Sequence, residues 1–68
     1  MWFYWVVYKG KHRYHLFSIH QEGKYFFYLG IDGRKAREIS QRKFAKLRMK
    51  FYHNAEQIQD FSESDIYM

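Results

Sequence analysis

The 68-residue sequence predicts an α+β fold, in which a small antiparallel β-meander packs against one amphipathic C-terminal helix. Two patterns support this prediction. In the first half of the chain, glycines separate runs rich in aromatic and β-branched residues, and these runs recur at a spacing of about 8–12 residues, as in a meander. After Ser40 the apolar period changes to that of an α-helix.

Strand boundaries follow from the glycines and the runs between them. The first three strands are expected at 2–9, 13–20 and 24–31. The dipeptide Asp32-Gly33 is a strong signal for a two-residue hairpin turn. It would lead into a short fourth strand at 35–39, so the sheet is expected to have three or four strands.

A helix is expected from Ser40 to His53, with Ser40 as its N-cap. Its apolar stripe consists of Phe44, Leu47 and Phe51, extended by Ala45, Met49 and Tyr52. The opposite arc consists of Arg42, Lys43, Lys46, Lys50 and His53. Arg48 projects between the apolar stripes, where it either extends its guanidinium past them to water or pairs with Glu38.

The last part of the chain reverses its charge and carries acids without Lys or Arg. Asn54 is a candidate cap for a second short helix. The apolar positions of that helix would be Ala55, Ile58 and Phe61. Because a chain of this length forms only one core, we expect a single domain over 1–61 and a frayed acidic tail at 62–68.

Positive charge is concentrated in one segment. Eight of the twelve Lys and Arg residues fall between Arg34 and Lys50, with Glu38 as the one acid among them, and the formal net charge is +5. Clustered like charge costs self-repulsion and favours a polyanionic partner, most often nucleic acid. An ordinary solvated face is the alternative. The candidate nucleic-acid-binding residues are Arg34, Lys35, Arg37, Arg42, Lys43, Lys46 and Lys50.

The expected sheet has more apolar surface than one helix covers, because its first and third strands carry apolar residues on both faces. The second face is closed by a second copy of the chain or by the C-terminal segment, stacks nucleobases, or docks on a foreign protein. The candidate stacking or interface residues are Trp2, Tyr4, Trp5, Tyr8, Tyr25 and Tyr28.

The expected order of elements and the basic charge resemble the small arm-site-binding domains of tyrosine integrases. In those domains a three-stranded sheet with a C-terminal helix reads DNA, and the sheet enters the groove. Here the helix is the more basic element and no diagnostic motif is shared, so the resemblance carries no residue roles to this chain.

The sequence gives little support to chemistry other than binding. It has no cysteine, and its four histidines are not spaced to hold a metal. We expect no enzymatic activity, no cofactor and no metal site. The apolar run at 2–8 is too short to span a bilayer and has no basic residues before it. We therefore expect a cytoplasmic protein without membrane contact.

The leading hypothesis is a small basic DNA- or RNA-binding protein of the kind that phages and other mobile elements encode. Its helix and the hairpin at 34–37 would contact phosphates. The alternative is a small viral-type inhibitor, of the anti-CRISPR or anti-nuclease class, that binds a host nucleic-acid-processing protein through its basic or aromatic surface. A homodimer through the second sheet face is compatible with nucleic-acid binding.

Overall fold

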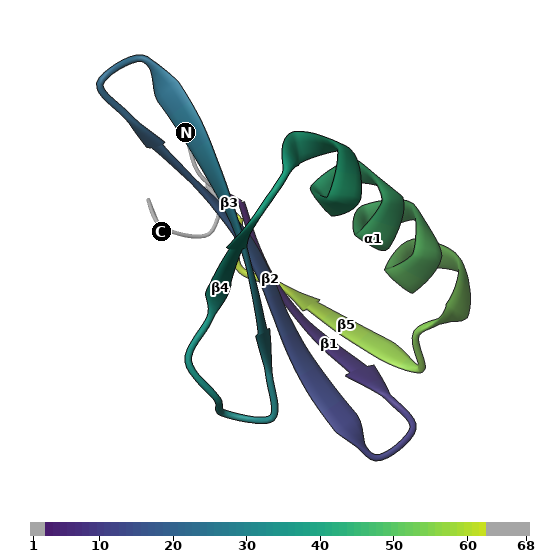
Figure 1. Ribbon diagram of the computed structural model, residues 1–68. Helices are drawn as coiled ribbons and strands as arrows, with labels where there is room; N and C mark the ends of the chain where they lie inside the picture. Colours follow the sequence, from purple (N-terminus) through teal and green to yellow (C-terminus); the bar gives the residue numbers. More distant parts are fainter. Residues whose placement is uncertain (1–2, 63–68) are drawn as a thin grey trace.

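The computed structural model describes residues 3–62. Its elements are β1 (Phe3–Lys9), β2 (His12–Gln21), β3 (Lys24–Ile31), β4 (Arg37–Ile39), α1 (Gln41–Asn54) and β5 (Gln57–Asp60). The strands form one antiparallel sheet in the order β4-β3-β2-β1-β5, and α1 covers one face of it (Figure 1). The predicted α+β class, with a meander and one amphipathic helix, is confirmed.

The turn predicted at Asp32-Gly33 is present. Both residues have positive φ angles, 51° and 77°, as a type I′ turn requires. The turn is closed by a hydrogen bond of 3.0 Å from the Arg34 N–H to the Ile31 carbonyl. The chain then runs outside the ladder, so β4 begins only at Arg37, two residues later than predicted.

The helix begins as predicted. Ser40 has extended backbone angles, φ −72° and ψ 158°, and its hydroxyl accepts a hydrogen bond of 3.1 Å from the Lys43 N–H. This bond satisfies one of the backbone donors that every helix start leaves unpaired. Because only Ser40 separates β4 from α1, the first turn of the helix starts directly from that edge strand.

The core lies between α1 and the sheet. Phe44 and Phe51 of the helix are 7% and 3% exposed, and Val7 and Leu16 beneath them are fully buried. The predicted extension of the apolar stripe by Ala45, Met49 and Tyr52 is wrong, because these side chains are exposed. The helix contacts the sheet along a narrow stripe, and residues about 100° away from it lie on its flank.

The second short helix predicted after Asn54 is absent from the described residues, since this segment forms β5. Ala55 ends α1 with extended backbone angles, φ −75° and ψ 146°. Gln57–Asp60 then pairs with β1, with Ile58 opposite Val7. The edge of β1 otherwise presents unpaired backbone groups, and an isolated short helix would be marginal. Pairing with the edge therefore prevails over the local helical pattern.

Two predictions concern residues at the ends of the chain. Trp2 lies outside the described residues, as does all of the predicted tail at 62–68 except Ser62. The Ser62 N–H donates a hydrogen bond of 2.9 Å to the Asp60 carboxylate. In the part of the chain that the structure describes, no helix has both the length and the apolar character needed to cross a membrane.

Candidate nucleic-acid interface

Four cationic side chains line one cavity of about 340 Å³ between the β3–β4 edge of the sheet and the start of α1. We call it the cationic hollow. Its cations come from the β3–β4 loop, from β4 and from the helix, and are Arg34, Lys35, Arg37 and Lys43. Its remaining lining is aliphatic and consists of Leu29, Ile31 and Ile39.

The fold explains why cations distant in sequence meet there. Arg37 pairs with Leu29 of β3, whose side chain packs against the core on the helix side of the sheet. Successive side chains of a strand alternate between faces, so Arg37 also lies on the helix side. Lys43 follows in the first turn of α1, which begins directly after β4. The two predicted basic segments thus form one site.

No carboxylate of the described residues lines the cationic hollow. Among residues 3–62, the one ion pair joins His12 and Asp32, at 2.6 Å between Nδ1 and Oδ2. None of the four cations of the hollow forms a contact ion pair with a carboxylate within the described structure, although the charge of Arg34 contributes to the lowered pKa of Asp32. Uncompensated charges of one sign in a concave surface raise the local concentration of oppositely charged ligands.

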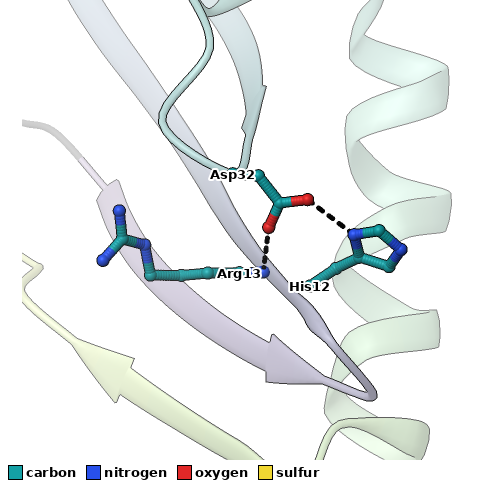
Figure 2. A network of polar contacts seen from close by, with 3 residues as sticks. All are labelled: His12, Arg13 and Asp32. Atoms are coloured by element: carbon teal, nitrogen blue, oxygen red, sulfur yellow. Dashed lines mark hydrogen bonds and ion pairs between the residues drawn. The ribbon is translucent and has the colours of Figure 1, made fainter.

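Asp32 directly follows Ile31, which lines the hollow, and its carboxylate is held by hydrogen bonds to His12 and to the Arg13 backbone (Figure 2). Its Oδ1 accepts a hydrogen bond of 2.9 Å from the Arg13 backbone N–H, whereas the Arg13 guanidinium extends away from it. This backbone hydrogen bond, followed by the hydrogen bond with His12, holds the pKa of Asp32 below its usual value. The contacts fix the turn from which Arg34 and Lys35 extend.

The other predicted cations of the helix lie on the surface that adjoins the hollow. Arg42, Lys46 and Lys50 are all exposed. Lys50 follows Lys43 by two turns and therefore lies on the flank that carries the hollow, while Arg42 and Lys46 point outward from the sheet. The structure thus joins four of the seven predicted cations in one cavity and places three beside it.

The position of Arg48 was predicted only in part. Its guanidinium lies 4.8 Å from the ring centre of Phe3 and 5.6 Å from that of Trp5, a cation–π arrangement. The guanidinium thus extends along the apolar surface, as one prediction held. The alternative pairing with Glu38 is not formed, because Glu38 lies opposite Tyr28 on the other face of the sheet.

A second cavity, of about 640 Å³, lies on the flank of α1 opposite the cationic hollow. We call it the apolar groove. Its lining consists of Trp5, Phe27, Gln41, Phe44, Ala45, Arg48, Met49 and Tyr52. The groove was not predicted, because Met49 and Tyr52 were expected to extend the apolar stripe of the helix, whereas they are 64% and 70% exposed. The signal for the groove in the sequence was the apolar arc of the helix, which is wider than the stripe of Phe44, Leu47 and Phe51.

The face of the sheet away from α1 carries a row of stacked rings. Tyr4, Phe17 and Tyr28 lie opposite one another on β1, β2 and β3. The ring centres of Tyr4 and Phe17 are 5.3 Å apart, and those of Phe17 and Tyr28 are 5.1 Å apart, with interplanar angles of 11° and 18°. Both faces of the central ring are therefore covered by its neighbours.

The remaining candidate aromatic residues are in different environments. Trp5 was predicted to stack on a ligand or form an interface, but it is only 7% exposed beneath α1. Its ring packs in the core cluster and also contributes to the lining of the apolar groove. Tyr8 is half-buried, and its hydroxyl donates to the Gln59 side chain at 3.5 Å. Tyr25 is 52% exposed and stacks on His20 at 4.5 Å.

The histidines occupy separate places on the sheet and helix. His15 contacts the Tyr4 hydroxyl through Nδ1 at 2.8 Å. Burial, and then the charge of Arg13, lower the pKa of His15. Within residues 3–62, no three His, Asp or Glu side chains are grouped so that they could hold a metal ion.

No protein-family model matches this chain, and no significant similarity to a curated protein or a solved structure was found. The fifth strand, which follows the helix, also departs from the three-stranded pattern of the arm-site-binding domains.

Proposed function

We propose that this protein binds nucleic acid and that the cationic hollow is the centre of its phosphate contacts. The observation that carries the proposal is the convergence of Arg34, Lys35, Arg37 and Lys43 on one cavity whose lining contains no acid. Arg and Lys are the principal phosphate-binding side chains, and Arg forms bidentate contacts with phosphate oxygens. The aliphatic lining strengthens each contact by reducing local screening.

The outer face of α1 extends the proposed contact surface. A helix of 14 residues is about 21 Å long at 1.5 Å per residue, so it can follow several phosphates of one strand. Arg42, Lys46 and Lys50 are placed to contact those next to the hollow. Such a protein would act in the cytoplasm, and its size and charge suit a product of a phage or another mobile element.

The test compares two double charge reversals by fluorescence anisotropy with labelled DNA and RNA, single- and double-stranded. In Arg37→Glu with Lys43→Glu the change falls in the hollow. In Lys11→Glu with Lys24→Glu the same charge change falls on exposed positions outside it, in the β1–β2 turn and at the first residue of β3. We expect affinity to fall at least about tenfold more in the first variant than in the second, because direct phosphate contacts dominate affinity. Circular dichroism checks that both variants fold.

Equal losses in the two variants would show that only net charge matters and would overturn the role of the hollow. Absence of binding to all four nucleic acids at low salt would overturn the proposal itself. In that case, a stoichiometric host protein recovered in a nuclease-treated pull-down would favour an inhibitor of a nucleic-acid-processing protein.

A further inference from the structure

The two flanks of α1 differ in chemistry, and the order of residues along the helix causes the difference. Phe44 and Phe51 face the sheet, and each has a lysine before it in the sequence, Lys43 and Lys50. Adjacent helix positions are about 100° apart, so both lysines lie on the flank of the cationic hollow. The residues that follow, Ala45 and Tyr52, lie on the other flank.

The apolar groove on that flank has the properties of a ligand site. Its volume, about 640 Å³, falls within the range of roughly 300–1,000 Å³ typical of small-molecule sites. Aromatic rings of Trp5, Phe27, Phe44 and Tyr52 contribute to its lining. Tyr52 and Met49 are accessible from solvent, at 70% and 64% exposed. Such a groove suits a flat, apolar group.

We propose that the apolar groove binds an unstacked nucleobase of a single strand, whose phosphates lie on the outer face of α1 and in the cationic hollow. This inference rests on the proposed function. Its occupant must combine an apolar ring with an attached anion, because Arg42 and Lys46 lie on the helix face between the groove and the hollow. A nucleotide has this combination.

Two polar side chains of the groove suit a base edge. Gln41 carries both a donor and an acceptor, as hydrogen bonding to a base requires. Arg48 carries a guanidinium, which stacks on bases and donates to their acceptors. Among the described residues, neither an Asp nor a Glu lines the groove, although the Asp60 carboxylate interacts electrostatically with Arg48 from outside it. Charge complementarity thus favours this occupant over an apolar protein segment.

The base must come from an unpaired strand. In a duplex the bases are stacked inside the helix, whereas the bases of single strands can turn outward and stack on protein side chains. The open sheet face is less suited to this role. The rings of Tyr4 and Tyr28 already stack against Phe17, and the groove leaves Tyr52 exposed.

The main experiment measures binding of a single-stranded oligonucleotide and a duplex of the same length to the double variant Met49→Ala with Tyr52→Ala. We expect single-strand affinity to fall about tenfold, as removal of a stacking side chain does, while duplex affinity stays within twofold. Tyr52→Phe keeps the ring and is expected to bind like the parent protein. Ile19→Ala, at a 41% exposed position on the other sheet face, is the matched control.

A crosslinking measurement locates the base directly. A strand that contains 5-iodouracil is irradiated with the protein, and the modified peptide is identified by mass spectrometry. We expect modification at Tyr52 or Met49. Modification confined to Tyr4 or Tyr28 would overturn the inference and assign base stacking to the open sheet face.

Other outcomes separate this inference from the proposed function. If Met49→Ala with Tyr52→Ala binds single strands normally, while Arg37→Glu with Lys43→Glu does not, the phosphate site stands and the base site fails. A parent dimer at micromolar concentration in sedimentation, converted to a monomer by the groove variant, would also overturn the inference. The groove would then be a contact between two copies of the chain.

Discussion

The Asp32 carboxylate accepts a hydrogen bond of 2.9 Å from the backbone N–H of Arg13, which joins the β3–β4 turn to the start of β2 (Figure 2). A return hydrogen bond of 2.8 Å runs from the Asp32 N–H to the Arg13 carbonyl. His12 completes the arrangement at 2.6 Å from the second carboxylate oxygen. The loop that carries Arg34 and Lys35 is therefore held, at its first residue, to β2, the middle strand of the sheet.

The first prediction concerns acid stability. The Arg13 backbone hydrogen bond, and then His12, lower the pKa of Asp32, so the carboxylate stabilises the fold above its unfolded pKa of about 3.9. That contribution is lost as pH falls through the lower folded pKa. We expect Asp32→Asn to reduce Tm at pH 7 and to reduce it less at pH 2.5. Parallel Tm profiles of the two proteins between pH 7 and 2.5 would contradict this.

The second prediction concerns His15, whose pKa is lowered by burial and then by the charge of Arg13. Folding therefore favours the neutral ring, and stability falls as pH drops from about 6.5, the unfolded value, through the folded pKa. We expect the urea midpoint of His15→Gln to change less between pH 7 and pH 5 than that of the parent protein. If the urea midpoint of the variant falls with pH as much as that of the parent protein, His15 does not cause the loss of stability.

The third prediction compares neighbours on the helix. Phe51 is 3% exposed and Tyr52 is 70% exposed. Phe51→Ala should lower the free energy of unfolding by about 3–5 kcal/mol, because it leaves a cavity in the core. Tyr52→Ala should change it by no more than about 0.5 kcal/mol, as is usual at exposed positions. Urea unfolding measures both, and similar losses would mean that α1 does not pack as described.

The fourth prediction concerns the helix start. Ser40→Ala removes the hydroxyl that accepts from the Lys43 N–H and should cost about 1 kcal/mol. Ser40→Asp should restore most of this stability, because aspartate is also a good N-cap and its charge suits the helix N-terminus. An alanine variant as stable as the parent would show that the cap contributes nothing.

Local patterns were sufficient to predict most of the fold. The turn at Asp32-Gly33 depends on positive φ angles, which are expressed directly in residue type. The helix depends on Ser40 and on apolar residues at helical spacing, which are also local. Both features are set by neighbours in the sequence, so one sequence is enough to predict them.

The remaining features depend on contacts between distant segments. Ala55, Ile58 and Phe61 have helical spacing, yet the edge of β1 draws Gln57–Asp60 into the sheet. The cationic hollow likewise requires β4 and the first turn of α1 to meet, which no spacing in the sequence specifies.

The fifth prediction concerns the number of phosphates that the outer helix face contacts. Log affinity for a single strand falls against log salt with a slope of about −0.7 for each neutralised phosphate. If Lys46 and Lys50 each contact one, Lys46→Gln with Lys50→Gln should make that slope shallower by about 1.4. Lys11→Gln with Lys24→Gln, which removes the same charge from exposed positions away from the helix, should change the slope less than Lys46→Gln with Lys50→Gln does. Anisotropy titrations from 50 to 300 mM salt measure it. A slope unchanged in the Lys46 and Lys50 variant would confine the phosphate contacts to the hollow.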